Sequence, residues 1–289
     1  MKEMEWIENK KILIVGLGLM GGSYARALKR LGFYVTAIDR NAESIGYALR
    51  ERIIREGSAG DGDEKLIREA DAIVSCLYPA VFPDWVREHQ HLFKPGLMMT
   101  DVTGVKGCVV YEIQSILRKD AEFIAAHPMA GRERSGVEFS DDRIFRDANY
   151  IIVPTEKNTA EGIRWCGRLG QLLGCGKITV LSPEEHDEMI AFVSQLTHCI
   201  AVSLMTCSDN THLVDYTGDS FRDLTRIARI NDRMWSELFM MNREPLLRQM
   251  DVFMKEMAEF RDMLDRGDTE GMRAKMRLST ERRALFDRK

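Results

Sequence analysis

The sequence contains no tract of basic residues and no basic stripe interleaved with aromatic side chains, which counts against nucleic-acid binding. Its longest apolar runs are far too short to span a bilayer, so we expect no membrane partner. The first residues, which include Glu3 and Glu5, have no apolar core and do not resemble a secretion signal. A net charge of -4 and 45% hydrophobic residues fit an ordinary soluble protein.

Cysteine is sparse, with six scattered residues and no close pair at the spacing of metal ligands, so we predict no metal site. Most of these cysteines lie in apolar runs and fit small buried thiols. Such thiols indicate a reducing cytosol and therefore a cytoplasmic protein. A chain of 289 residues is long enough for two domains with a sizeable core.

Short β-branched runs alternate with amphipathic helical stretches from about residue 10 to residue 181. This alternation predicts an α/β, Rossmann-like N-terminal domain with a mostly parallel sheet covered by helices. The expected strands are Lys11–Val15, Tyr34–Ile38, Ala72–Cys76, Leu97–Asp101, Phe123–Ala126, Tyr150–Val153 and Lys177–Leu181.

The pattern changes after Leu181. Ser182, Pro183 and Glu185 form a strong helix start, with serine as the N-cap and glutamate three residues after it. The periodicity from there onward is helical, which predicts a nucleotide-binding domain over 1–181 and an all-α domain over 182–289. One long helix carries an apolar seam that fits packing within the chain as well as it fits a dimer interface. The seam consists of Leu246, Met250, Phe253, Met257, Phe260 and Leu264.

A glycine pattern G-x-G-x-x-G joins the first expected strand to a helix expected over 24–31. Gly16 allows the tight turn, Gly18 lets the backbone approach a pyrophosphate, and Gly21 permits close packing of helix on strand. The alternative is an α/β turn that binds no ligand. The residues that we expect to line the cofactor here are Gly16, Gly18, Leu19, Met20 and Gly21.

The next strand ends at Asp39, 23 residues after Gly16. A carboxylate at this place accepts hydrogen bonds from the adenosine ribose hydroxyls and repels a 2′-phosphate, so NAD is favoured over NADP. Arg40 complicates the choice, because an arginine there can hold the phosphate or stack on adenine. Two further strand ends, at Ser75–Leu77 and at Thr103, are expected on the nicotinamide side, although either fits a turn without a ligand.

His127 follows the short apolar strand expected over 123–126, and Pro128 is expected to lead the chain out of that strand. The carboxyl ends of strands in such a sheet carry its chemistry. A neutral imidazole at this edge can take a proton near neutral pH. The alternative is a core histidine that is hydrogen-bonded to a loop carbonyl.

In the helical half, Ser194 and His198 lie four residues apart and share a helix face within an apolar segment. A capping or buried hydrogen bond explains them equally well. His186 falls in the first turn of its helix among acidic residues, so we expect it to be solvated. Arg222 and Arg226 are also four apart, and one of them is a candidate clamp for a substrate carboxylate, with a surface ion pair as the alternative.

Taken together, these motifs resemble the prephenate dehydrogenase family, over nearly the whole chain from Lys11 to about Trp235. The residues that carry the resemblance are the glycine loop with Asp39–Arg40, the segment 101–106, His127–Gly131 with Ser135–Gly136, Ser194–His198, Asp223–Ala228 and Trp235.

The resemblance implies an enzyme of tyrosine biosynthesis that oxidatively decarboxylates prephenate to 4-hydroxyphenylpyruvate and passes hydride to NAD. It makes His127 the base on the ring hydroxyl and Arg226 the ligand of a substrate carboxylate. It also implies that His198 and Ser194 position the substrate, Trp235 walls the pocket and Glu133 pairs with Arg226 to control entry.

Two positions depart from the family pattern. Family members often have glycine-serine where this chain has Thr103-Gly104, so Thr103 is a candidate for the hydroxyl that supports His127. Arg132 stands where a smaller polar residue is common, and we hypothesise that its charge lowers the pKa of His127.

Other functions remain open on sequence grounds. The same chemistry on arogenate would give tyrosine directly, and a non-catalytic nucleotide-sensing protein would keep the glycine loop but need neither His127 nor Arg226. A 3-hydroxyacid dehydrogenase would use a lysine in the helical domain, yet no lysine occurs between Lys177 and Lys255. The helical domain alone would hardly close a pocket, so we expect a homodimer through the C-terminal helices.

Overall fold

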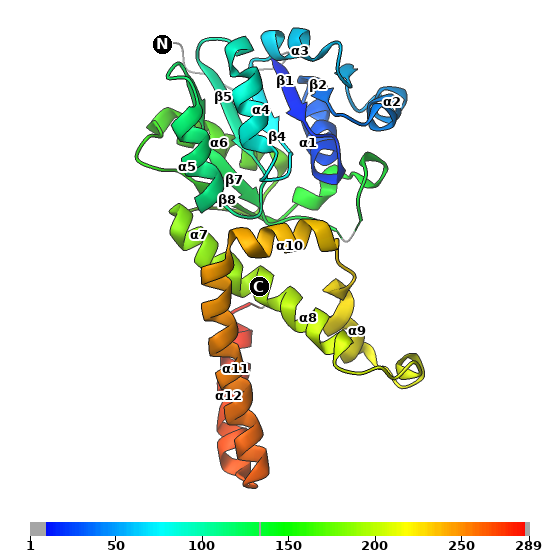
Figure 1. Ribbon diagram of the computed structural model, residues 1–289, viewed down its shortest axis with the longest axis vertical. Coiled ribbons are helices and arrows are strands. Elements are labelled where there is room, and N and C mark those ends of the chain that lie inside the picture. The colour runs from blue at the N-terminus through cyan, green and yellow to red at the C-terminus, as the bar shows by residue number, and fades with distance from the viewer. Residues whose placement is uncertain (1–9, 133, 287–289) are drawn as a thin grey trace. The chain divides into compact units, whose positions relative to one another are not determined.

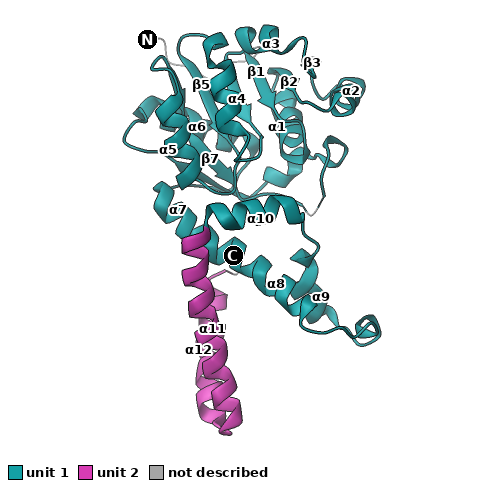
Figure 2. Cartoon of the chain, in the orientation of Figure 1, with its two compact units in different colours: residues 1–242 teal, residues 243–289 magenta. Residues whose placement is uncertain are grey.

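The computed structural model describes residues 10–132 and 134–286. The chain forms two compact units, residues 1–242 and residues 243–289, which Figure 2 shows in teal and magenta. This division by compactness differs from the one expected at 181/182, which stays a prediction.

A six-stranded parallel sheet in the order β3-β2-β1-β4-β5-β6 forms the centre of the first unit (Figure 1). This order confirms the expected Rossmann-like fold. The sequence prediction missed β3, a three-residue strand without β-branched residues. The strands are β1 Lys11–Val15, β2 Tyr34–Ile38, β3 Glu56–Ser58, β4 Ala72–Ser75, β5 Leu97–Asp101 and β6 Ala121–Phe123.

Alternate residues of each strand face two separate layers of helices. In β1, Ile12 and Ile14 pack in the core that α1 and α6 cover, whereas Leu13 and Val15 pack in the core that α3, α4 and α5 cover. Burial on both faces explains why the strand is a continuous apolar run. These helices are α1 Leu19–Arg30, α2 Ala42–Arg50, α3 Asp63–Glu69, α4 Phe82–His89, α5 Gly107–Ile116 and α6 Ala160–Leu173.

The apolar run that we expected to form one strand over 123–126 is divided between two sheets. Phe123 ends β6, and β7 (Ala125–Pro128) belongs to a second sheet with β8 (Asn149–Val153) and β9 (Lys177–Val180). Strand β7 is antiparallel to β8, whereas β8 and β9 are parallel. His127 and Pro128 therefore lie inside β7, not beyond the end of a strand as expected.

The chain becomes helical at Ser182, as predicted. The Ser182 hydroxyl accepts a hydrogen bond from the Glu185 amide and the Glu185 carboxylate accepts one from the Ser182 amide, which forms a capping box. The helices that follow are α7 Pro183–Ile190, a π-helical stretch Ala191–Leu196, α8 Thr197–Thr206, α9 Asp219–Thr225, η6 Arg226–Ala228 and α10 Asp232–Met241.

The expectation that every apolar stretch is too short to span a bilayer is wrong. Helix α7, the π-helical stretch and α8 together span Pro183–Thr206, 24 residues that are long and apolar enough to cross a membrane by these two measures alone. This is weak evidence for a membrane segment, because helices that pack within or between protein chains pass the same test. Only 28% of its apolar window is buried in the single chain, so most of that surface is left to be covered.

The second unit is a pair of helices, α11 (Arg243–Asp265) and α12 (Thr269–Ala284). Lys275 of α12 forms an ion pair with Glu256 of α11 at 2.6 Å. The predicted apolar seam lies on α11, where Met257 and Leu264 are 57% and 64% exposed.

Candidate active site

The glycine loop lies between β1 and α1 and brings three backbone segments close together. Gly16 has a φ of +91°, and a Cβ there would lie 2.8 Å from the carbonyl oxygen of Cys76. A Cβ on Gly21 would lie 2.0 Å from the Gly16 carbonyl oxygen. Only glycine fits at these two positions, because both obstacles are backbone atoms. At Gly18, by contrast, an added Cβ would meet nothing within 4 Å, so the backbone there is open to a ligand.

Asp39 at the end of β2 is tied to this loop. One carboxylate oxygen accepts a hydrogen bond from the Leu17 amide at 2.5 Å, and the other accepts one from the Asn41 amide at 2.8 Å. Arg40 is exposed beside it, while Leu19 and Met20 are half-buried at the start of α1. An open loop at a helix N-terminus with an adjacent carboxylate is the arrangement that holds NAD.

Two of the remaining expected cofactor positions, Ser75 and Leu77, differ in burial. Ser75 is fully buried at the end of β4, and its hydroxyl has no hydrogen-bond partner in the part of the chain that the structure describes. Leu77 is half-buried in the loop that follows. Their contacts with a cofactor stay predictions.

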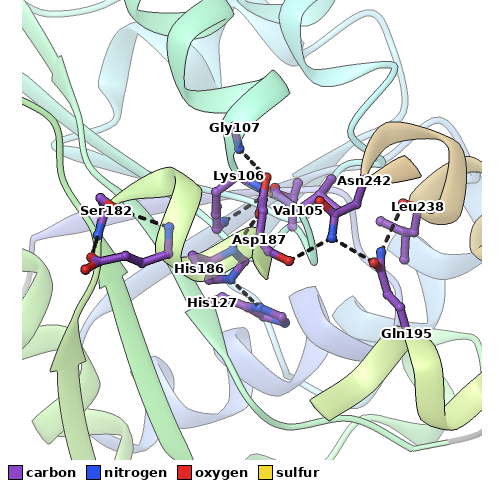
Figure 3. Close-up of polar contacts among 12 residues, drawn as sticks. Val105, Lys106, Gly107, His127, Ser182, His186, Asp187, Gln195, Leu238 and Asn242 are labelled. Atoms are coloured by element: carbon purple, nitrogen blue, oxygen red, sulfur yellow. Dashed lines mark hydrogen bonds and ion pairs between the residues drawn. The ribbon is translucent and has the colours of Figure 1, made fainter. Parts of the chain in front are cut away.

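His127 contacts a residue that the sequence interpretation misplaced. Its Nδ1 lies 2.9 Å from Nε2 of His186, and Nδ1 of His186 lies 2.8 Å from a carboxylate oxygen of Asp187 (Figure 3). The expectation that His186 is solvated is wrong, because its side chain is fully buried. The carboxylate of Asp187 crosses to the N-terminus of α5 and accepts hydrogen bonds from the amides of Lys106 and Gly107, both at 2.8 Å.

Among the residues that the structure describes, the hydrogen bonds of the Thr103 hydroxyl go to residues other than His127. The single hydroxyl hydrogen lies between two acceptors, the Asp101 carboxylate and the Val105 carbonyl oxygen, and the hydroxyl oxygen accepts a hydrogen bond from the Lys106 ammonium at 3.1 Å. The supporting role of Thr103 therefore stays a prediction, and the residue that is hydrogen-bonded to His127 in the structure is His186. Thr103 is instead drawn into the buried ion pair between Lys106 and Asp101, whose atoms are 2.7 Å apart.

The pKa of His127 lies well below its ordinary value of 6.5. The largest cause is burial, and the neighbouring His186 and Lys106 act in the same direction. The hypothesis that Arg132 causes the shift is wrong, because the Arg132 guanidinium lies 3.0 Å from the carboxylate of Asp141 and forms an ion pair with it. His127 is neutral at pH 7 and can accept a proton.

The structure brings together some of the helical residues that we expected to contact the substrate. The rings of His198 and Trp235 stack with centroids 3.7 Å apart, and Nδ1 of His198 donates to the Ser194 carbonyl oxygen at 2.9 Å. Arg226 is exposed in η6, which packs against α8. Glu133 lies outside the described residues.

Helix α10 links this helical region to the strand ends. The Glu237 carboxylate accepts a hydrogen bond from the Ala80 amide, in the loop after β4, at 2.9 Å. The side chain of Leu238 lies 3.7 Å from where a Cβ on Gly104 would be. The helical residues of the first unit therefore face the edge that carries the glycine loop and His127.

Sequence reasoning missed the polar residues that support His127. His186 and Asp187 looked like part of a charged first helical turn, and Lys106 and Gln195 looked unremarkable beside their neighbours.

Two family matches cover most of the chain. Residues 24–177 match the family described as "Prephenate dehydrogenase, nucleotide-binding domain", and residues 182–278 match "Prephenate dehydrogenase, dimerization domain".

Individual relatives agree with these matches. Prephenate dehydrogenase of Bacillus subtilis is 30% identical over 90% of this chain and 72% of its own length. Cyclohexadienyl dehydrogenase of Zymomonas mobilis is 28% identical over 94% of this chain and 97% of its own. A crystal structure of prephenate dehydrogenase from A. aeolicus, in complex with hydroxyphenyl propionate and NAD+, superposes with a TM-score of 0.89 at 29% identity, covering 98% of this chain and 100% of that one.

The glycine loop and His127 are the site features expected of the enzymes that these matches name. The chain therefore belongs to the prephenate dehydrogenase family and is an NAD-dependent oxidoreductase.

Proposed function

We propose that this protein catalyses the NAD-dependent oxidative decarboxylation of prephenate to 4-hydroxyphenylpyruvate, a step of tyrosine biosynthesis. The observation that carries the proposal is the position of His127 next to Ala126, whose amide donates to the Asp101 carboxylate at 3.1 Å, at the carboxyl ends of the strands that also present the glycine loop. The names of the relatives from Bacillus subtilis and A. aeolicus support prephenate as the substrate.

In the proposed reaction His127 removes the proton from the hydroxyl on ring carbon C4. The electron pair of that O–H bond forms the carbonyl as the C4–H bond breaks and its hydride leaves. The C1 carboxylate departs as carbon dioxide, and its bonding electrons complete the aromatic ring while the carbonyl π electrons move onto the C4 oxygen, which takes a proton and becomes the phenol hydroxyl. NAD, when bound at the glycine loop and Asp39, supplies the hydride acceptor.

The substrate contacts are proposals that the family resemblance suggests. Arg226 binds a carboxylate, Ser194 and His198 orient the ring, Trp235 forms one wall, and Glu133 pairs with Arg226 at the entrance. The stack of His198 on Trp235 supports this assignment, because it gives a rigid aromatic surface beside α8.

Replacing Arg226 with alanine should raise the KM for prephenate by roughly 10- to 100-fold with a smaller change in kcat, since a hydrogen bond to a charged group is worth about 1.5–3 kcal/mol. Initial rates at varied prephenate and saturating NAD measure this. Arg222→Ala is the matched control, because Arg222 is an exposed arginine one helical turn away. Equal KM values for parent and Arg226→Ala would remove Arg226 from the site.

The choice of ring substrate is tested by offering prephenate and arogenate separately, each with NAD and with NADP, and following reduced nicotinamide. Arogenate dehydrogenase activity is the second candidate, because the Zymomonas mobilis relative is named for the broader cyclohexadienyl class. We expect prephenate with NAD to give the highest kcat/KM. Turnover of arogenate alone would assign the second activity, and no turnover of either would leave a nucleotide-binding protein without this chemistry.

We also propose that two copies associate through the C-terminal helices. The single chain leaves Phe192 and Val193 54% and 45% exposed, together with Met257 and Leu264 of the α11 seam. Apolar side chains at this density favour a protein interface, and the match of residues 182–278 is to a family described as a dimerization domain.

The six cysteines are free thiols, which supports a cytoplasmic location.

Sedimentation equilibrium at micromolar concentration should give the mass of a dimer of the 33.1 kDa chain. The substitution Leu264→Glu should shift the equilibrium toward monomer, because it places a charge in the apolar seam. Lys255→Glu on the same helix, at an exposed position outside the seam, is the control for a charge change alone. A monomeric parent protein would contradict this proposal.

A further inference from the structure

A continuous line of three side chains leads from His127 into the protein interior. His127 is on β7, and His186 and Asp187 are on the first turns of α7 (Figure 3). The two distances along the line are 2.9 Å between the imidazoles and 2.8 Å between His186 and the carboxylate. Both are ordinary hydrogen-bond lengths, so each ring nitrogen involved must be paired as either donor or acceptor.

The direction of these hydrogen bonds follows from Asp187. Its two carboxylate oxygens already accept the amide hydrogens of Lys106 and Gly107 at the N-terminus of α5, so both act as acceptors. An ionised carboxylate only accepts, so Nδ1 of His186 carries the hydrogen. In a neutral imidazole the other nitrogen then has the lone pair, and Nε2 of His186 accepts from Nδ1–H of His127.

Burial keeps His186 neutral. Its side chain is fully buried, and burial lowers its pKa although Asp187 acts in the opposite direction. The charged groups that face the two histidines from neighbouring elements are Lys106 at the start of α5, Asp101 on β5 and Asp187 on α7. Lys106 is paired with Asp101 and also donates to the Ala126 carbonyl oxygen at 2.7 Å, next to His127.

We propose that His186 and Asp187 are positioning residues that hold His127 in its Nδ1–H tautomer, so that Nε2 presents its lone pair to the substrate hydroxyl. The inference rests on the proposed role of His127 as the base. It gives His186 the role of supporting His127, which the family resemblance led us to expect of Thr103.

The line is anchored on the helical side as well. The Asn242 amide donates to the Asp187 carbonyl oxygen at 2.9 Å and to the Gln195 side-chain oxygen at 2.7 Å, and Gln195 donates to the Leu238 carbonyl oxygen at 3.0 Å (Figure 3). All three side chains are nearly or fully buried. These contacts fix α7 against the π-helical stretch and α10, so the orientation of the base depends on the helical region.

Nitrogen-15 NMR of histidine-labelled protein tests the tautomer without substrate. The two nitrogens of His127, assigned by their loss in His127→Asn, should give a protonated Nδ1 and an unprotonated Nε2 at pH 7. In His186→Phe, which removes the acceptor but keeps a ring, the Nε2–H tautomer should become the main form. A protonated Nε2 in the parent protein would overturn the inference, even if the enzyme oxidises prephenate through His127.

Kinetics give the second readout. His186→Phe should lower kcat on the order of 10²-fold, as expected when a catalytic imidazole loses its tautomer, with little change in NAD affinity. His186→Gln, whose amide oxygen can accept from His127, should recover at least tenfold of that loss. His91→Phe is the control, because His91 is an exposed histidine outside this line.

The outcomes separate a positioning role from a structural one. A loss of kcat that Gln reverses at an unchanged melting temperature supports positioning. Equal losses in the Phe and Gln variants, with the His127 tautomer unchanged in both, would show that His186 serves only to fill the interior and would overturn the inference.

Discussion

Replacing His127 with asparagine should lower kcat for prephenate oxidation by about 10²- to 10⁴-fold, the usual effect of removing one general base. Asparagine can still donate a hydrogen bond toward His186, so the local fold should persist. It offers no nitrogen that takes a proton near pH 7. NAD affinity should stay close to that of the parent, because the glycine loop and Asp39 belong to other strand ends.

Steady-state rates of NAD reduction and a calorimetric titration with NAD measure these two quantities. His89→Asn is the control, since His89 donates to the Trp85 carbonyl oxygen on α4 and stacks on that tryptophan outside the site. A His127→Asn variant that turns over at the parent rate would exclude His127 as the base. A loss of NAD affinity equal to the loss of rate would show that the substitution disturbs the fold of the site.

Replacing Gly21 with alanine should weaken NAD binding by roughly 5- to 150-fold. The added Cβ would lie 2.0 Å from the Gly16 carbonyl oxygen and 3.1 Å from a methyl carbon of Ile14, so the start of α1 must move away from β1. Overpacking of this kind costs about 1–3 kcal/mol. The movement displaces the helix N-terminus that faces the pyrophosphate.

The measurement is the NAD dissociation constant together with the melting temperature of the variant. Gly46→Ala on α2 is the control, because the nearest atom to its added Cβ is the end of a flexible arginine side chain at 3.3 Å. Unchanged NAD affinity in Gly21→Ala would mean that the loop does not hold the cofactor in this way.

The fold was predictable where local patterns suffice. Strands β1, β2 and β5 have the expected boundaries, because their apolar runs end at turn residues and are buried on both faces. The helix start at Ser182 was predictable from its capping residues alone. Strand β3 and the division between β6 and β7 were not, since pairing with neighbouring strands decides both.

The candidate site was also predictable only where the signal is local in the sequence. The glycine loop, Asp39 and His127 could be found because their signals are contiguous in sequence. The pairing of His127 with His186 joins residues 59 positions apart, and the Asp187 contact with α5 joins residues 81 positions apart. Thr103 was a candidate support for His127 because of its position in a motif, whereas its hydroxyl contacts the buried Lys106–Asp101 pair.

The pH dependence of kcat/KM for prephenate at saturating NAD tests the base role of His127 most directly. A base must lose its proton to act, so activity falls as the pH drops through the pKa of His127. Because that pKa is lowered, the acid limb should be centred clearly below pH 6.5, with constant activity from there to neutral pH, and it should be absent in His127→Asn. An acid limb centred above pH 6.5, or one that persists in His127→Asn, would contradict His127 as the proton acceptor.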